Sequence, residues 1–221
     1  MDDSDTSAIV KAQVEDTRLV KKRQQQIVAA ALKRFGENGY YTTTIKDIAQ
    51  EAGVSPGLIY QYFQDKEDVL LLALLECVDS YAREIPPAVA GETHPVARLR
   101  AAFAAYCRVV DRNKAAAVLA YRSTKSLDKR RRKLVMDREL ETNALLAACV
   151  RECISGGYVR EVNVELVSYQ LVMMAHAWAL KAWHFSRLFT IEDYVRQSLD
   201  IVLNGLLTSA GKRSLSKVRN G

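Results

Sequence analysis

One group of residues in the N-terminal half carries the groups that proteins use to bind nucleic acids. Their side chains are small, or they end in a hydroxyl, phenol or amide: Ser55, Pro56, Gly57, Tyr60, Gln61 and Tyr62. Phenol and amide groups hydrogen-bond to phosphates or base edges, and a proline ring can contact a thymine methyl group. Glycine at a helix start lets the backbone approach closely. We expect these residues to form the outer face of a helix that enters the major groove.

The surrounding segment is punctuated as a helix, a tight turn and a second helix. Thr44 can cap the helix 45–52, with Asp47 placed as in a capping box. Gly53 suits the left-handed conformation that ends such a helix, and Ser55 can cap the next one. The pattern predicts a helix-turn-helix. Helix pairs of this shape also occur in proteins that never contact DNA, so the spacing alone leaves both interpretations open.

The composition favours an all-α protein with an ample core. Hydrophobic residues make up 49% of the 221 residues, and the small numbers of proline (4) and glycine (10) disfavour a β-sandwich with frequent turns. The N-terminus, Met1–Asp5, is acidic and unlike a secretory signal. The apolar run Val69–Leu75 is far shorter than the ~18–20 residues that span a bilayer. We therefore expect a soluble, cytoplasmic protein that has no membrane partner.

Residue types that bind metals or act as nucleophiles lack the spacing that their chemistry needs. The four cysteines form no CxxC pair, and the three histidines are scattered. Cys149 and Cys153 stand one turn apart on a predicted helix. We interpret them as small buried apolar side chains, with a redox pair as the alternative. With no phosphate-binding loop or nucleophile elbow, the sequence predicts no metal, no cofactor and no enzyme activity.

Helical periodicity and its breaks divide the chain into four parts. We predict a flexible arm over residues 1–17 and a helix-turn-helix domain over 18–64. A larger helical domain follows over 65–208, and a basic tail that frays covers 209–221.

The larger domain is predicted to begin with a linking helix at 65–85. We expect this helix to end before Pro86 and Pro87, because proline interrupts helical hydrogen bonding. Apolar stripes and caps predict the helices that follow at 95–110, 115–121, 128–154, 163–185 and 190–207.

Further residues extend the helix-turn-helix pattern over about residues 20–75. They are Phe35–Tyr40, Thr42–Ile45, Ile48–Ala49, Ala52–Ser55, Gly57, Tyr60–Phe63 and Lys66–Leu70. In order and spacing this block resembles the N-terminal domain of TetR-family transcriptional repressors. The resemblance implies a homodimer that binds a palindromic DNA operator through two recognition helices. It also implies a variable C-terminal domain that binds a small-molecule inducer.

The resemblance also assigns candidate DNA contacts by position. These are Thr43, Thr44, Ser55, Pro56, Gly57, Tyr60, Gln61, Tyr62 and Lys66. The basic run Lys21, Lys22 and Arg23 can bind backbone phosphates or reach the minor groove. Because charge runs are often only solvated, the alternative for these three residues is an exposed helix face.

The strongest basic cluster lies outside the helix-turn-helix. Residues 122–138 hold eight Lys and Arg against two Asp, a net charge of +6. The cluster is a solvated helix start, an auxiliary patch for DNA or phosphate, or a site that recognises an anionic inducer. A helix start is a poor place for cations, since the helix dipole disfavours them there.

Aromatic and sulfur-containing side chains in the larger domain supply a candidate apolar cavity. With the basic residues beside them, the candidate ligand contacts are Phe103, Tyr106, Tyr121, Arg122, Arg130, Arg131, Met174 and Trp178. An apolar cavity with a cationic rim suits an acyl chain on a phosphorylated carrier. Ordinary core packing is the alternative for each apolar residue.

The C-terminal half loosely resembles the TetR-family branch that senses acyl-CoA thioesters of fatty-acid, steroid or aromatic-acid degradation. The resemblance makes an acyl-CoA the suspected inducer. The alternative is a multidrug-type sensor of a hydrophobic compound that controls an efflux gene. Such a sensor of cations would favour buried carboxylates, and Glu161 and Glu165 are the few candidates.

The last two predicted helices, at about 163–185 and 190–207, would form the dimer interface by analogy with the family. Apolar residues cover more than one face of the first of these helices, as expected when a helix packs against both its own core and a partner.

Overall fold

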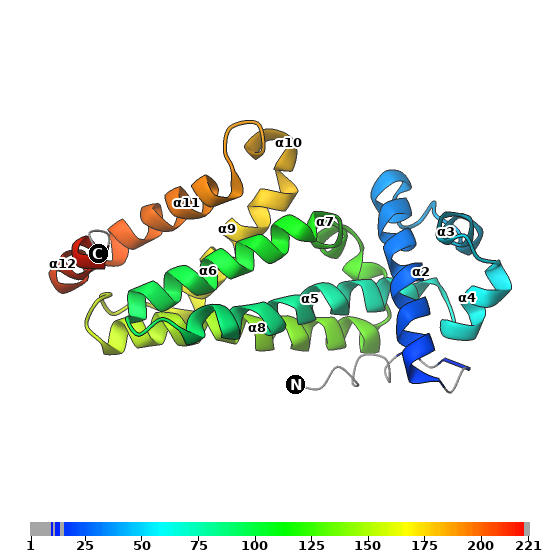
Figure 1. Ribbon diagram of the computed structural model, residues 1–221, viewed down its shortest axis with the longest axis horizontal. Coiled ribbons are helices and arrows are strands. Elements are labelled where there is room, and N and C mark those ends of the chain that lie inside the picture. Colours follow the sequence, from blue (N-terminus) through cyan, green and yellow to red (C-terminus); the bar gives the residue numbers. More distant parts are fainter. Residues whose placement is uncertain (1–9, 11, 14–15, 219–221) are drawn as a thin grey trace. The chain divides into compact units, whose positions relative to one another are not determined.

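The computed structural model describes residues 10, 12–13 and 16–218, and it is built from helices (Figure 1). In chain order they are α2 (Thr17–Asn38), α3 (Ile45–Ala52), α4 (Pro56–Tyr62), α5 (Lys66–Ala90), α6 (Pro95–Arg112), α7 (Lys114–Ser123), the 3-10 turn η1 (Thr124–Ser126), α8 (Lys129–Ser155), α9 (Val164–Leu180), α10 (Ala182–Phe185), α11 (Ile191–Leu206) and α12 (Ser209–Val218). An isolated antiparallel bridge joins Val159 and Leu207. The all-α prediction is confirmed. Among the described helices, none combines the length and the apolar character that a bilayer crossing requires.

The chain forms two compact units. The N-terminal unit comprises residues up to Val78 together with Ala115–Asp137, and the C-terminal unit comprises Asp79–Lys114 and the residues from Arg138 onwards. This division differs from the predicted boundary at residue 65, because the first part of α5, up to Val78, and the segment Ala115–Asp137 belong to the N-terminal unit. Leu119, Leu127 and Val135 are buried in the apolar core of that unit, which explains the assignment.

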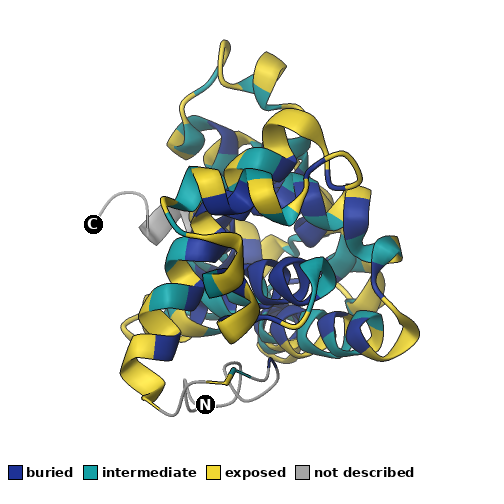
Figure 2. Ribbon diagram, turned by 90° about the vertical axis from the view of Figure 1, so that its right-hand side faces the viewer, coloured by how far each residue is buried: buried dark blue, intermediate teal, exposed yellow. Residues whose placement is uncertain are grey.

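The N-terminal unit is organised around three packed helices. α2 packs against α3 and α4, and α3 packs against α4. Their inward faces meet in a core that contains Ile27, Phe35, Ile48, Ile59 and Phe63. In Figure 2 the buried faces of the packed helices are dark blue, and their outer faces are yellow.

The C-terminal unit is held together by helices that are far apart in the sequence. α6 packs against α9 and α11, and α9 also packs against α10 and α11. Large side chains fill its interior, including the fully buried Phe103, Tyr106 and Leu146.

Three helix predictions are corrected. The helix expected at about 163–185 is divided, because α9 ends at Leu180 and the short helix α10 starts at Ala182. α5 does not end at Pro86 but continues to Ala90, with both prolines inside the helix. A proline near a helix end removes a hydrogen bond but keeps a helical φ. Ile85, which precedes the two prolines, is buried, and its packing outweighs the lost hydrogen bonding and keeps the segment helical. Residues 209–218 form the helix α12, where a frayed tail was expected. The Thr208 hydroxyl accepts the Gly211 backbone N–H at 3.1 Å, which caps that helix.

The ends of the chain lie partly outside the described residues. Most of the predicted arm at 1–17 and the final residues 219–221 are in this part, so these predictions stay open. α2 itself begins at Thr17, where the Asp16 carboxylate accepts the backbone N–H groups of Arg18 and Leu19.

Candidate nucleic-acid interface and ligand site

Local hydrogen bonds build the helix-turn-helix as the sequence predicted. The Thr44 hydroxyl accepts the Asp47 N–H at 3.2 Å, and the Asp47 carboxylate accepts the Thr44 N–H at 2.7 Å, which completes the capping box. Gly53 ends α3 with φ +66°, a conformation that costs glycine no Cβ clash. The Ser55 hydroxyl then accepts the Leu58 N–H at 3.2 Å and starts α4.

This geometry leaves a polar and compact surface at the start of α4. Of the predicted DNA contacts, those that lie exposed are Lys22, Thr44, Ser55, Pro56, Gly57, Tyr60 and Gln61. The Tyr60 side chain is 51% exposed. A small-residue helix start followed by a phenol and an amide offers hydrogen-bonding groups to a groove edge or to phosphates.

Two predicted DNA contacts, Tyr62 and Thr43, are instead buried inside the protein. The expected position of Tyr62 on the outer face is wrong, because Tyr62 is buried on the same face of α4 as Ile59, three residues earlier. Thr43 is buried, and its hydroxyl donates to the Gly39 carbonyl at 2.8 Å. A buried hydroxyl of this kind cannot reach a phosphate.

Lys66 binds the loop that precedes α3. Its ammonium group donates to the carbonyl oxygens of Tyr40 and Thr43, each at 2.8 Å, and it lies 4.4 Å from the centre of the Tyr40 ring. Partial burial lowers the pKa of Lys66. The residue therefore shapes the loop before α3, which differs from the direct DNA contact that the sequence predicted.

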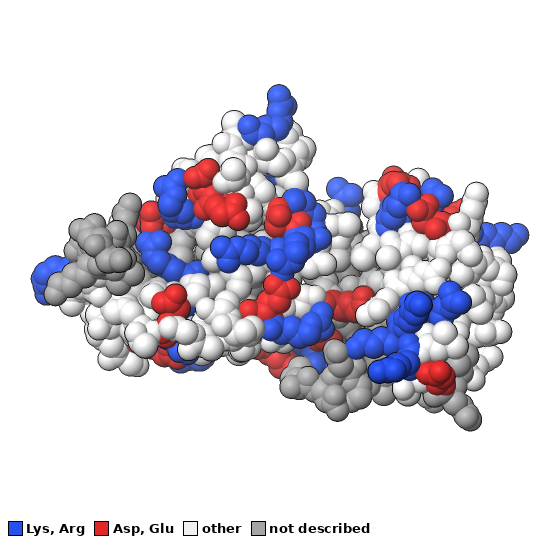
Figure 3. Space-filling view, viewed as in Figure 1, with Lys and Arg blue, Asp and Glu red and all other residues white. Residues whose placement is uncertain are grey.

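Basic side chains also flank the helix-turn-helix on α2. Lys21 and Lys22 are exposed, and the guanidinium of the half-buried Arg23 donates to the Gln26 side chain at 2.8 Å. Figure 3 shows Lys and Arg side chains gathered over the N-terminal half of α2. A stripe of this kind can track a phosphate backbone.

Arg131 has a structural environment that the charge run concealed. Its guanidinium lies 2.6 Å from Asp68, 2.9 Å from Asp65, 3.2 Å from Glu67 and 3.3 Å from Asp128. The residue is 9% exposed. Burial lowers its pKa, but hydrogen bonds to Asp65 and Asp68 outweigh burial and raise it overall. The prediction that Arg131 contacts the ligand is therefore wrong, because its guanidinium is already bound by carboxylates of the protein.

The remaining candidate ligand residues fall into different units. Phe103, Tyr106, Met174 and Trp178 belong to the C-terminal unit, and all except the half-buried Met174 are buried. The other candidates, Tyr121, Arg122 and Arg130, belong to the N-terminal unit and are exposed. No single compact unit therefore brings together the apolar and the cationic parts of the predicted ligand site.

Inside the C-terminal unit the candidates join a polar cluster. The Tyr106 and Tyr81 rings stack at 4.1 Å, and their phenol oxygens lie 3.3 and 3.4 Å from Nε2 of His176. Burial lowers the pKa of His176 to about 4. The Trp178 indole donates to Asp111 at 2.6 Å. Both aromatic candidates thus combine a buried ring with a satisfied polar group.

Two polar residues on α8 were not among the residues predicted from the sequence. Asn143 is 4% exposed, and both its amide nitrogen and its amide oxygen lack a hydrogen-bond partner within the described part of the chain. Glu139 lies one turn earlier, and burial raises the pKa of its carboxyl group. Their spacing on a helix with apolar neighbours Leu146 and Ala147 was the available signal. Unpaired buried amides are uncommon, so Asn143 is a candidate ligand contact.

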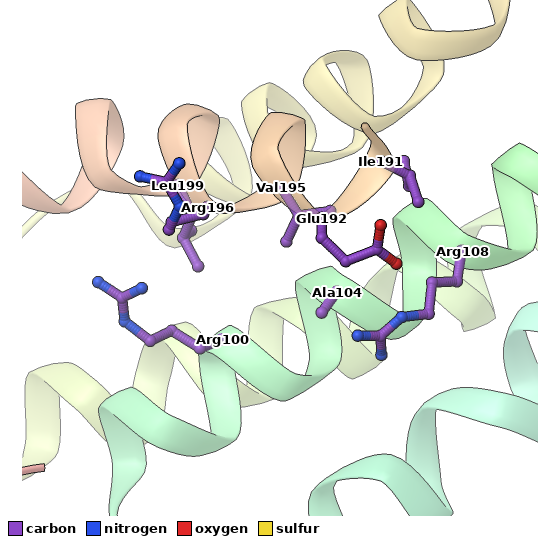
Figure 4. Close-up of a pocket in the computed structure, with 8 residues that line it drawn as sticks. All are labelled: Arg100, Ala104, Arg108, Ile191, Glu192, Val195, Arg196 and Leu199. Carbon is purple, nitrogen blue, oxygen red and sulfur yellow. The ribbon is translucent and has the colours of Figure 1, made fainter. Parts of the chain in front are cut away.

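A small pocket opens between α6 and α11. It is lined by Arg100, Ala104, Arg108, Ile191, Glu192, Val195, Arg196 and Leu199. Figure 4 shows the Glu192 carboxylate extending from α11 toward α6, on the side of Arg108. Arg100 is paired with Asp200 at 2.6 Å. The volume of about 180 Å³ is below the ~300–1,000 Å³ typical of ligand sites, so a whole thioester does not fit.

Metal binding finds no support in the described residues, where no group of three or more His, Cys, Asp or Glu could hold an ion. The buried Cys149 and Cys153 are free thiols, and burial raises the pKa of both.

Comparison with known proteins agrees with this geometry. Residues 27–73 match the family "Bacterial regulatory proteins, tetR family", and residues 92–206 match "Tetracyclin repressor-like, C-terminal domain". The HTH-type transcriptional regulator HbdR of Aromatoleum sp. (strain CIB) is 50% identical over 216 residues, which cover 98% of this chain and 94% of HbdR. The HTH-type transcriptional repressor KstR2 of Mycobacterium tuberculosis is 28% identical over 193 residues, 85% of this chain and 94% of KstR2.

A solved structure shares the fold at lower identity. The crystal structure of AibR in complex with isovaleryl coenzyme A and operator DNA superposes with a TM-score of 0.69 at 18% identity, covering 81% of this chain and 97% of AibR.

A helix-turn-helix with an exposed second helix, followed by a separate helical C-terminal unit, is the architecture of a helix-turn-helix transcriptional regulator. The chain belongs to the TetR family of bacterial regulatory proteins.

Proposed function

We propose that the protein is a ligand-responsive repressor that binds a palindromic operator as a homodimer and is released by an acyl-CoA thioester. The observation that carries the DNA-binding part is the exposed start of α4, where Ser55, Pro56 and Gly57 precede the exposed Tyr60 and Gln61. Residues of this kind at the first turns of a second motif helix fit the major groove.

A homodimer is supported by apolar residues that α9 and α11 leave exposed. Leu166 and Met173 are two turns apart on α9 and are 60% and 40% exposed, and Ile201 on α11 is 75% exposed. Two-fold dimers use one self-complementary patch. Pairing these helices would cover the exposed side chains and present two recognition helices to half-sites about one DNA turn, ~34–36 Å, apart or somewhat more.

An acyl-CoA as inducer is supported by the chemistry of the candidate residues and by AibR, whose structure contains isovaleryl coenzyme A. Within the C-terminal unit, the buried aromatic residues Phe103 and Trp178 offer apolar groups against which an acyl chain can pack. Asn143 adds an amide that can bind a neutral polar group of the ligand.

One observation favours the alternative of a sensor for hydrophobic cations that controls an efflux gene. Glu139 supplies a carboxyl group in a largely desolvated position of the C-terminal unit, which a cationic drug could neutralise. A cationic dye panel therefore belongs in the first experiment.

Release from DNA requires that the inducer bind better to the conformation that does not fit the operator. A ~100-fold preference corresponds to about 2.7 kcal/mol per site. We expect the linking helix α5, which runs from the N-terminal into the C-terminal unit, to move and change the separation of the two recognition helices.

The test is a gel-shift titration with the DNA upstream of the gene. The additions are acetyl-, isovaleryl-, octanoyl- and benzoyl-CoA, free CoA, and the cationic dyes ethidium and rhodamine 6G. A specific shift that one thioester reverses, but free CoA does not, supports the proposal. Release by a dye alone supports the efflux alternative, and a missing specific shift contradicts operator binding.

A further inference from the structure

Two long helices, α5 and α8, offer a route by which a ligand signal can reach the DNA-binding helices. α5 and α8 each start in the N-terminal unit and continue into the C-terminal unit. In each unit, an ion pair of low exposure joins one of these helices to the other. The two pairs involve Arg131 with Asp68 at 2.6 Å and Arg138 with Asp79 at 3.6 Å.

The first pair lies beside the DNA-binding helices. Asp68 is in the first turn of α5, directly after α4, and its second carboxylate oxygen accepts the backbone N–H of Gln64 at 3.0 Å. Arg131 bonds the other oxygen of Asp68 from the first turn of α8. Arg131 therefore fixes the point at which the chain leaves the recognition helix.

The same region of the chain also reaches the opposite end of the motif. Ser126, three residues before α8, donates its hydroxyl to the Tyr41 phenol oxygen at 2.7 Å. Tyr41 lies in the loop that leads into α3, and Lys66 at the start of α5 binds the carbonyl of its neighbour Tyr40. The entrance and the exit of the helix-turn-helix are thus both bound to the start of α8 or α5.

The chemistry of the first ion pair, Arg131 with Asp68, suits the transmission of movement from one helix to the other. Four carboxylates surround the Arg131 guanidinium, and its side chain is only 10% exposed. A planar guanidinium binds several carboxylates in fixed geometry, and separating such a group from its partners leaves charges unpaired at low exposure. Charge-assisted hydrogen bonds thus join the first turn of α8 to Asp68 on α5 and, through its second oxygen, to Gln64.

We propose that α5 and α8 carry the inducer signal as an ion-paired couple, with Arg131 as the positioning residue that passes movement of α8 to the helix-turn-helix. The proposal rests on the proposed function as a ligand-responsive regulator and adds the route of regulation. It differs from the sequence-based expectation, in which the linking helix alone moves.

The first test needs neither operator nor inducer. Amide hydrogen exchange over residues 39–63 is compared in wild type, Arg138→Gln, the paired change Arg131→Gln with Asp68→Asn, and the combination of all three. The paired change removes both partners, so that no buried carboxylate is left facing a missing cation. Lys133→Gln is the control, since it removes the same charge from an exposed ion pair one half-turn away.

We expect the paired change to speed exchange in 39–63 by about tenfold, while Lys133→Gln leaves it unchanged. Arg138→Gln should speed exchange there only when Arg131 is present. The proposal would be overturned if the paired change did not alter the exchange rate over residues 39–63. It would also be overturned if the effects of Arg138→Gln and of the paired change on this rate simply multiplied in the combined variant. If that variant fails to fold, Arg131→Lys, which keeps the charge but loses the planar fork, replaces it with the same expectation.

The second test measures the operator affinity of these variants with and without the thioester that releases the wild type. We expect the ratio of the two affinities to fall by about fivefold or more in the paired variant, with thioester binding retained. An unchanged ratio contradicts the proposed role of Arg131 and leaves the proposed inducer class intact. A wild type that no thioester releases contradicts the proposed inducer class, and the exchange experiment then still decides the role of Arg131.

Discussion

The imidazole of His176 on α9 lies 3.3 Å from the phenol oxygen of Tyr106 on α6, inside the C-terminal unit. Tyr81 on α5 stacks on Tyr106 and reaches the same ring nitrogen. Three helices therefore meet at one histidine that burial keeps neutral, since its pKa is lowered to about 4.

This histidine predicts an acid-sensitive stability. In the unfolded chain His176 takes up a proton near its ordinary pKa of 6.5, whereas in the folded protein it does so only near 4. Between these two pH values the unfolded state binds more protons than the folded state. The contribution of neutral His176 to the free energy of unfolding is therefore complete above pH 6.5. It falls by about 3 kcal/mol as the pH is lowered toward 4. Denaturant unfolding at pH 7.5 and 4.5 measures it. His176→Gln should reduce this loss, and the exposed His184→Gln is the matched control. An equal loss in His176→Gln and wild type would contradict the assignment.

Tyr60 is expected to contact the operator. Because its side chain is exposed on α4, Tyr60→Ala should weaken operator binding by about tenfold or more and leave the fold intact. Tyr60→Phe separates the phenol hydroxyl from the ring. Fluorescence anisotropy with labelled operator measures both variants, with circular dichroism as the folding control. Unchanged affinity in Tyr60→Ala would remove Tyr60 from the interface.

Lys22 and Lys66 should differ in how salt affects DNA binding. Lys22 is exposed, and Lys22→Met should reduce the slope of log affinity against log salt concentration by about 0.9. Lys66→Met leaves the carbonyl groups of Tyr40 and Thr43 without their donor, so we expect a stability loss of about 1–3 kcal/mol and an unchanged slope. If Lys66 binds phosphate directly, Lys66→Met will also reduce the slope of log affinity against log salt concentration.

Asn143 should contribute to inducer recognition at the expense of stability. Asn143→Leu removes an unpaired buried amide, so the ligand-free protein should melt at the same or a higher temperature. The thioester concentration needed for release should rise by about tenfold. Thr142→Val is the control, because the neighbouring Thr142 is equally buried but its hydroxyl already donates to the Arg138 carbonyl at 3.0 Å. A lower melting temperature with normal release would show that Asn143 stabilises the core.

Leu166 should lie in the dimer interface. A charged residue in the centre of an apolar interface costs about 2 kcal/mol or more, so Leu166→Lys should shift the protein toward monomer in sedimentation experiments. Leu188→Lys changes a leucine of similar exposure, 58% against 60%, outside both predicted interface helices. If both variants remain dimeric, α9 does not form the interface through this face.

Part of the candidate DNA-binding surface was predictable because its determinants are local. The caps Thr44 and Ser55 and the turn residue Gly53 form their hydrogen bonds within a few residues of themselves, so their types and spacing suffice. The face of α4 that points outward was less predictable. Tyr60 and Tyr62 are alike as residues, and only packing against the rest of the unit buries one of them.

The basic segment 122–138 also contains like residues whose different environments could not be predicted from the sequence. Arg130 and Arg131 are adjacent and identical in type, yet the first is exposed and the second lies among four carboxylates. Three of these carboxylates belong to residues 65–68, more than sixty positions earlier in the chain. Counting charges therefore identified the segment but could not distinguish its members.

Local sequence signals set where most helices of this protein begin and end, and they place two of these helices in a helix-turn-helix. These features depend on backbone hydrogen bonds and caps between near neighbours in the chain. Tertiary structure decided that Arg131 positions helices, that Lys66 binds a loop and that Asn143 lies unpaired in the interior. Burial and ion pairing depend on residues that only folding brings together, so no local pattern contains them.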